Sequence, residues 1–200
     1  MSSDDILLVT SLGATRYKET KYWFGEERNQ CSNKTKFPAV ALVDIINKRP
    51  EKVLLVATDE ALSFADGDKK QVDELKDAFS KRNISFDTVN PPMPEEDQWE
   101  QFARLNKALS CDAKEIWFDI TYGFRSQPFF AAAVIAFQRA SGDRRPLRVF
   151  YGAYEAGEPE GERVKETAPI WELTEFVTVL DWALALHLFL KTGRAEDAAR

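Results

Sequence analysis

The amino-acid sequence predicts an α/β protein built around a mainly parallel β-sheet. Apolar runs rich in β-branched residues are typical of buried strands, and they occur at residues 6–10, 53–58, 84–89, 116–120 and 147–152. Segments with the apolar spacing of helices lie between them, at residues 37–47, 71–82, 98–109 and 129–140. Strands that alternate with such helices form βαβ units, and right-handed crossovers place the helices on both faces of the sheet. We therefore expect a Rossmann-like, doubly wound fold.

The segments outside this alternation predict smaller features. We expect a small hairpin at 21–30, an exposed turn in the Gly-, Glu- and Pro-rich stretch 155–167, and extended chain at 169–174. Residues 176–190 predict a helix that is apolar almost all round, which must be buried on more than one side by a partner chain or a following domain. We expect a ligand-binding domain at 1–175 and a C-terminal helical segment at 176–200. That segment would contact a second copy or lead into an effector domain.

Composition excludes several classes of function. The net charge of −6 argues against nonspecific binding of duplex DNA, so an anionic ligand would need a local pocket. The 2 cysteines make no disulfide framework, and the N-terminus has no basic, apolar leader, so we expect a cytoplasmic protein. No segment has the roughly 20 apolar residues of a membrane span. Metal-ligand clusters and the dinucleotide and P-loop fingerprints are missing, so we expect no cofactor and no metal.

The most informative segment is Asp119-Ile120-Thr121-Tyr122-Gly123-Phe124-Arg125-Ser126-Gln127-Pro128. An apolar strand ends here, and an apolar segment of helical length begins directly afterwards. Backbone N–H groups at a helix N-terminus lack intrahelical partners and carry the positive end of the helix dipole, so they attract anions. The loop also offers an arginine, hydroxyl groups and a glycine. It therefore predicts a site for a negatively charged group.

The fold places a second loop beside the first. In the usual doubly wound order the first and fourth strands are neighbours at the sheet centre, and ligands bind at the carboxyl ends of the strands that flank this switch point. The loop after the first strand, at 11–20, contains Gly13, Thr15 and Arg16, and so offers similar chemistry. We expect both loops to face one crevice.

These loops resemble those of a known family. Residues 119–128 resemble the Asp-x-Thr-His-Gly-Phe-Arg-Ser-x-Pro signature of CRISPR-associated Rossmann fold (CARF) proteins, in the DxTHG-motif branch associated with type III CRISPR systems. Segments 11–22, 57–61 and 169–176 are similar to further parts of that branch. Tyr122 departs from the signature, which usually has histidine there. A tyrosine can hydrogen-bond and stack, but it cannot carry a positive charge near a phosphate.

The resemblance implies a homodimer that binds cyclic oligoadenylate, the second messenger of type III CRISPR antiviral defence. The ring of four adenylates (cA4) is the expected ligand, with the ring of six (cA6) as the other candidate. It would lie across the dimer axis, over the carboxyl ends of the strands. The leading hypothesis is an allosteric sensor that passes the signal to an attached effector. The alternative is a ring nuclease that cleaves the messenger, for which the sequence shows no clear general base.

The resemblance also implies roles for individual residues. Contacts to the phosphates are expected from the glycines, hydroxyls and arginines of both loops and from the Ala14 backbone: Gly13, Thr15, Arg16, Thr121, Gly123, Arg125 and Ser126. Contacts to the adenines are expected from the polar groups of Thr58, Glu60 and Gln127. The rings available for stacking are Tyr17, Tyr122 and Phe124.

Plainer interpretations stay open for several of these residues. Arg125 either binds a phosphate or pairs with a surface carboxylate, and Thr121 either binds the ligand or only caps the strand end. Asp119 is expected to brace a loop by accepting backbone N–H bonds rather than to act as a base. Phe124 is either a core residue or a ligand wall, and His187 is expected to be packed or at an interface.

Overall fold

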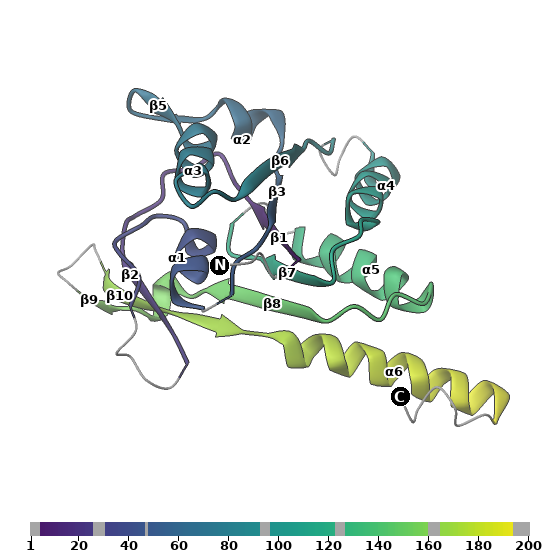
Figure 1. Cartoon of the computed structure of the whole chain (residues 1–200). Coiled ribbons are helices and arrows are strands. Elements are labelled where there is room, and N and C mark those ends of the chain that lie inside the picture. Colours follow the sequence, from purple (N-terminus) through teal and green to yellow (C-terminus); the bar gives the residue numbers. More distant parts are fainter. Residues whose placement is uncertain are drawn as a thin grey trace.

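An eight-stranded sheet forms the centre of the protein in the computed structural model (Figure 1). The structure describes residues 5–25, 31–46, 48–92, 97–122, 127–159 and 165–193. The strands of the sheet are β1 (Ile6–Ser11), β2 (Lys21–Phe24), β3 (Lys52–Val56), β6 (Ser85–Val89), β7 (Glu115–Asp119), β8 (Leu147–Gly152), β9 (Glu158–Pro159) and β10 (Lys165–Glu172). Their spatial order is β2-β10-β8-β7-β1-β3-β6, with β9 paired to β10.

The five predicted strands are the parallel strands at the middle and one side of this sheet. β1 pairs with β3 on one side and with β7 on the other, and Leu7 lies opposite Lys52 and Ile116. β6 continues the sheet beyond β3, and β8 continues it beyond β7, again in parallel. The first and fourth predicted strands are therefore neighbours, and the winding reverses between them. The predicted α/β, mainly parallel Rossmann-like fold is confirmed.

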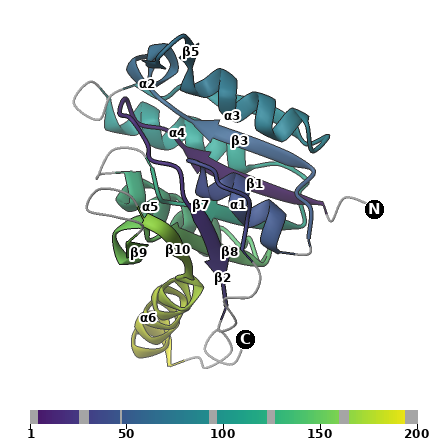
Figure 2. The ribbon, with the colours of Figure 1, turned by 90° about the vertical axis from the view of Figure 1, so that its left-hand side faces the viewer.

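Helices cover both faces of the sheet (Figure 2). They are α1 (Pro38–Ile45), α2 (Asp59–Ser63), α3 (Gln71–Ser80), α4 (Gln98–Leu109), α5 (Gln127–Ala140), α6 (Thr174–Thr192) and the short 3₁₀ helix η1 (Tyr154–Ala156). Ile6 and Leu8 of β1 join the core cluster of α1 and α3, whereas Leu7 and Val9 join the cluster of α4 and α5. With both faces covered, side chains on both sides of the strand are buried, which explains the continuous apolar sequence of residues 6–9.

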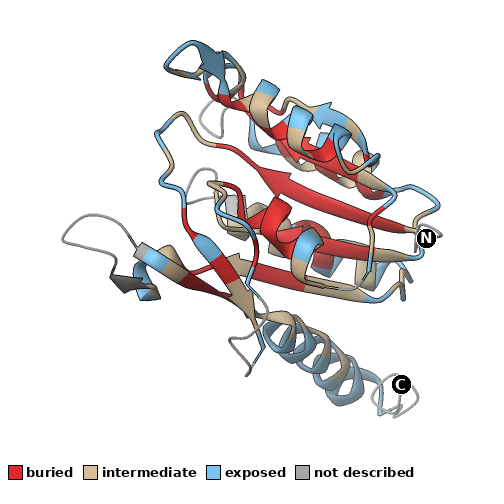
Figure 3. Cartoon of the chain, turned by 60° about the vertical axis from the view of Figure 1, so that its left-hand side comes forward, coloured by how far each residue is buried: buried red, intermediate tan, exposed pale blue. Residues whose placement is uncertain are grey.

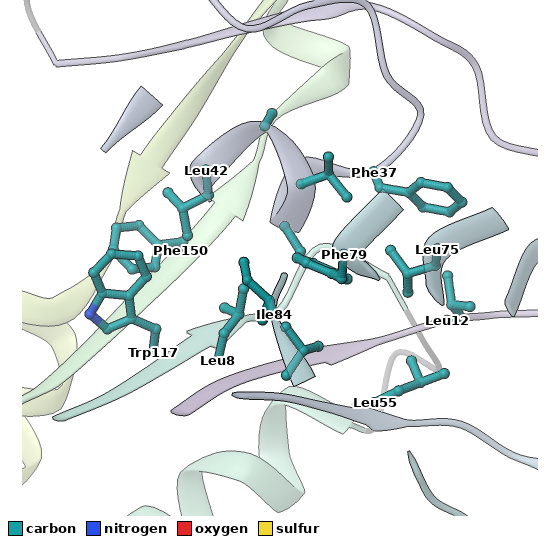
Figure 4. Packing of buried hydrophobic residues seen from close by; sticks show 14 of the residues in the cluster. Leu8, Leu12, Phe37, Leu42, Leu55, Leu75, Phe79, Ile84, Trp117 and Phe150 are labelled. Carbon is teal, nitrogen blue, oxygen red and sulfur yellow. The ribbon is translucent and has the colours of Figure 1, made fainter. Parts of the chain in front are cut away.

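The larger core cluster joins the sheet to α1 and α3 (Figure 4). Trp117 and Leu8 from the strands share it with Leu42 of α1 and Phe79 of α3, and each of them is at most 1% exposed. Burying a large apolar side chain contributes about 1.5–3 kcal/mol. Burial is concentrated along the central strands (Figure 3), so the core holds in place the strands whose carboxyl ends carry the two loops.

Three segments differ from the expectation or were not predicted. The stretch 155–167 is more than a turn, since it contains most of η1, β9 and the start of β10, which is antiparallel to β8. In the stretch 21–30, β2 pairs in parallel with β10, and Trp23 forms an antiparallel bridge to Cys31; residues 26–30 lie outside the described part. The helix α2 and a small hairpin, β4 (Ala65–Asp66) and β5 (Lys69–Lys70), are additions between β3 and α3.

The C-terminal helix α6 is present as predicted, and its apolar surface is exposed in the described chain, so its burial by a partner chain or a following domain stays a prediction. None of its residues is buried, and Phe176, Trp182 and Leu190 are 71%, 62% and 74% exposed. α6 contacts α5 and β8 and extends along the lower side of the molecule in Figure 1. An apolar pattern identifies a helix but does not say which surface covers it, and His187 is likewise exposed. None of the described helices combines the length and the apolar character needed to cross a membrane.

Gly152, the last residue of β8, gives a test of the packing between sheet and α1. A methyl group there would lie 2.6 Å from Cγ of Pro38. We predict that Gly152→Ala lowers the free energy of unfolding by about 1–3 kcal/mol, because the proline ring leaves no room for the added carbon. Urea unfolding measures the change. In the control, Pro38→Ala combined with Gly152→Ala should cost less than the two single changes added together, and strict additivity would contradict the clash.

Candidate functional site

The loops that follow β1 and β7 are in direct contact. Ser11, the last residue of β1, donates a hydrogen bond from its hydroxyl to the backbone carbonyl of Tyr122, 111 positions further along the chain. Tyr17 of the first loop stacks on Tyr122, with ring centroids 3.6 Å apart and an angle of 10° between the planes. The structure thus brings the described parts of both loops together at the switch point of the sheet.

Asp119 braces the end of β7 from inside the protein. Its buried carboxylate accepts hydrogen bonds from Thr10 Oγ1 at 2.8 Å, from the Thr121 backbone N–H at 3.1 Å, and from the Thr121 hydroxyl. Thr121 Oγ1 in turn accepts a bond from the Gly152 N–H at 2.8 Å, so Thr121 caps the strand end. Burial raises the pKa of Asp119, although these hydrogen bonds oppose the rise. The contacts support the bracing role that the sequence favours for this residue.

The two stacked tyrosines use their hydroxyl groups on the backbone. Tyr122 donates to the carbonyl of Lys36 at 2.6 Å. The Tyr17 hydroxyl accepts a bond from the Gly13 N–H at 2.6 Å and donates to the Gly13 carbonyl at 3.1 Å. Burial raises the pKa of Tyr17 to about 12 and also raises the pKa of Tyr122, so both stay neutral at physiological pH. Because each ring covers one face of the other, only the remaining faces can stack on a ligand.

In the first loop a hydrogen bond fixes the backbone, and the arginine side chain is exposed. The buried side chain of Gln71 donates from Nε2 to the carbonyl of Thr15 at 2.7 Å. Arg16 follows, with its side chain 78% exposed and its Nε 3.2 Å from Asp66 Oδ1. An exposed ion pair contributes about 0–1 kcal/mol, so a phosphate can take the place of Asp66 at little cost. Thr15 is exposed and Ala14 is half-buried, so both lie within reach of a ligand on this surface.

The segment after β3 contributes less to the site than predicted. Thr58 is buried, and its Oγ1 accepts a bond from the Ala61 N–H at 3.5 Å, so it caps the N-terminus of α2. Glu60 is exposed on the first turn of that helix. Of this pair, only Glu60 offers a side chain that a ligand can reach.

The second half of the motif lies outside the described residues. This holds for Gly123, Phe124, Arg125 and Ser126, and for the side chain of Gln127, whose backbone begins α5. Their contacts with a ligand stay predictions. Tyr122 precedes this segment and α5 follows it, so both of its ends are fixed at the same edge of the sheet.

A cavity of about 40 Å³ lies at the switch point, between the ends of the central strands and the helices α4 and α5. Its walls are mostly apolar, but Asp119 and Gln101 also line it. Gln101 is 3% exposed, and its side-chain oxygen has no hydrogen-bond partner within the described ranges. Gln101 was not predicted from the sequence. Its spacing could have indicated that it is buried, since Gln101, Leu105 and Leu109 lie four residues apart on the buried side of α4.

The raised pKa of Asp119 gives a prediction about pH. A carboxyl group whose pKa is raised by folding stabilises the folded protein most at low pH. This stabilisation is lost as the pH rises from 3.8, the usual pKa of aspartate, through the pKa of the group in the folded protein. Asp119→Asn cannot ionise and keeps one acceptor oxygen, while the Thr10 hydroxyl can rotate to accept a bond. We predict that wild type loses stability relative to this variant over that range, and that the difference then levels off.

Urea unfolding of both proteins between about pH 4 and pH 8 measures this difference. Comparing the two proteins cancels the carboxyl groups whose pKa is lowered by cationic neighbours, such as Asp143 beside Arg145. A stability difference that does not change with pH would contradict the raised pKa of Asp119.

Comparison with known proteins gives one distant relationship. No protein-family model matches the chain. Over 142 residues the chain is 22% identical to the CRISPR-associated protein MJ1674 of Methanocaldococcus jannaschii. The match covers 66% of this chain and 22% of that protein, so the chain spans about a fifth of its relative's length. The described site therefore belongs to a chain with distant similarity to a CRISPR-associated protein.

Proposed function

We propose that this protein is a CARF-type sensor that binds cyclic oligoadenylate, most simply cA4, at a homodimer interface and transmits the signal to an effector in type III CRISPR defence. The observation that carries the proposal is the contact between the loops after β1 and β7, made by Tyr17 and Tyr122 at the switch point. The resemblance of residues 119–128 to the DxTHG signature and the distant similarity to a CRISPR-associated protein support it.

The charges at the crevice suit an anionic ring. Arg16 is exposed and, among the described residues, pairs with the half-buried carboxylate of Asp66, whereas Lys36 is largely buried between Asp66 and Glu74 and is not available. A charge-assisted hydrogen bond contributes about 1.5–3 kcal/mol, so a few of them can hold a small polyanion. A two-fold axis would present the same donors to both halves of a symmetric ring, which is why a dimer is part of the proposal.

The described side chains favour binding over cleavage. Cleavage of the ring by its own ribose 2′-hydroxyl needs a group that can take up the proton. The Asp119 carboxylate is buried and hydrogen-bonded, and burial raises the pKa of both Tyr17 and Tyr122, which keeps them protonated. His187, the one histidine of the sequence, lies exposed on α6. We therefore favour the sensor hypothesis over the ring nuclease hypothesis.

Binding of cA4 tests the proposal. Isothermal titration should show one ring bound per two chains of wild type. Arg16→Ala should weaken binding at least about 10- to 100-fold, because it removes a contact worth roughly 1.5–3 kcal/mol from each of the two chains. Lys114→Ala is the matched control, since Lys114 is 81% exposed in an ion pair with Asp5 and precedes the opposite, amino end of β7. Its affinity should equal that of wild type.

Two outcomes would overturn the sensor hypothesis. Wild type that binds neither cA4 nor cA6 would remove its basis. Recovery of linear fragments instead of intact ring, seen by chromatography after incubation, would replace it with the ring nuclease. An equal loss of affinity in Arg16→Ala and Lys114→Ala would show that only the overall charge matters.

The exposed surface of α6 supports the dimer in the proposal. Its outer side chains are more than half exposed, namely Phe176, Val179, Trp182, Leu186 and Leu190. Apolar patches of this kind mark interaction surfaces. Because Trp182 and Leu186 lie four residues apart, they are on one side of the helix.

We predict that Trp182→Glu combined with Leu186→Glu converts the dimer to a monomer, because a carboxylate cannot be buried there without a partner. Light scattering after size-exclusion chromatography measures the mass. Lys191→Glu, at an exposed position in the last turn of α6, is the control and should leave the dimer intact. A dimer that survives the double change would show that α6 is not the contact.

A further inference from the structure

The cavity at the switch point contains a polar group that the fold does not satisfy. Gln101 lines this cavity from α4, and it is 3% exposed. Its Oε1 has no hydrogen-bond partner within the part of the chain that the structure describes. A buried amide without a partner destabilises a protein, and an apolar residue would serve the packing better. The presence of glutamine here therefore calls for an explanation.

Gln71 shows what a structural glutamine does in this fold. It lies on the buried side of α3 and, like Gln101, is buried, and its Nε2 holds the backbone of the first loop through the Thr15 carbonyl, while its Oε1 has no partner among the described residues. The Oε1 of Gln101 is also without a described partner, but Gln101 lines the cavity rather than holding a loop. Its amide is instead available to whatever enters the cavity.

The shape and chemistry of the cavity fit the edge of a flat ring. Its volume of about 40 Å³ is several times the roughly 10–15 Å³ that one buried water needs. Val56 and Phe118 of the strands and Ala131 of α5 provide apolar walls, and Tyr122 also lines the cavity. Mostly apolar walls with a few polar groups, here Gln101 and Asp119 among them, are typical of sites for small-molecule ligands. A glutamine amide pairs with adenine by accepting a bond from N6 and donating one to N7.

We propose that Gln101 determines base specificity: one adenine of the ligand enters this cavity and pairs through its N6 and N7 edge with the Gln101 amide. The proposal rests on the proposed function and names the residue that reads the base. A hypoxanthine has an oxygen in place of the N6 amine, so both of its groups on that edge are acceptors. The Gln101 amide can then satisfy only one of them, and its own oxygen faces the other.

Titration of four proteins with two rings tests the proposal. The proteins are wild type, Gln101→Leu, Gln101→Met and Gln98→Leu, and the rings are cA4 and cyclic tetra-inosinate. Gln98 is exposed at the start of the same helix, so Gln98→Leu is the matched control. Wild type and the control should bind cA4 about 10- to 100-fold more tightly than the inosinate ring. Both Gln101 variants should lose most of this preference and bind cA4 about tenfold or more weakly.

The stability of the same proteins separates lost recognition from lost folding. Leucine or methionine replaces an unpaired buried amide by apolar atoms, so urea unfolding should show equal or higher stability in the Gln101 variants. If Gln101→Leu does not fold, Gln101→Met carries the test. Gln101 variants that bind and discriminate as wild type does would overturn this inference alone. Wild type that binds neither cA4 nor cA6 would overturn the proposed function, and this inference with it.

Discussion

A buried carboxyl group joins the ends of three neighbouring strands. Asp119 at the end of β7 accepts a bond from Thr10 of β1, and through the Thr121 hydroxyl it is linked to the backbone of Gly152 in β8. A buried ionisable group is tolerated only when its hydrogen bonds are made. A shift of one residue between β1 and β7 would turn Thr10 to the opposite face and break the network. The contact that fixes the register therefore also fixes where both loops begin.

Outside this network, the polar groups of the crevice differ in how firmly they are held. Tyr17 and Tyr122 are half-buried and bonded to backbone atoms, whereas the exposed Arg16 pairs with the carboxylate of Asp66. Losing a buried hydrogen bond is costly, while losing an exposed ion pair is not. An anion can therefore attract Arg16 without disturbing the strand ends. A binding site on loops requires a rigid scaffold that positions groups free to contact the ligand. Here the hydrogen-bonded strand ends are the scaffold, and Arg16 is the group that can exchange its partner.

Whether a part of the structure could be predicted from the sequence depended on the physical cause of that part. β1 could be predicted because burial on both faces makes residues 6–9 continuously apolar, whereas β10, with Lys165 and Pro169, shows no such run and was expected only in part, as extended chain at 169–174. The hairpin of β4 and β5 is too short for any periodicity. The family resemblance implied that Thr58 contacts a ligand, yet the acidic first turn that follows it is equally a helix-capping signal. Gln101 joins the site only through packing, so neither loop sequence pointed to it.

The helix α5 connects the crevice to α6, and space remains on both of its sides. The cavity beside Gln101 and a second cavity of about 190 Å³ toward α6 share wall residues, among them Phe118, Pro128 and Ala131. A helix beside unfilled space forgoes part of its dispersion contacts, so it can shift at lower cost than one in a closely packed core. α5 also contacts α6, where Arg139 lies 3.7 Å from Asp181. On the proposed sensor function, a base that fills the first cavity changes the contacts of the helix on which α6 rests, and only such differential contact can shift a conformational equilibrium.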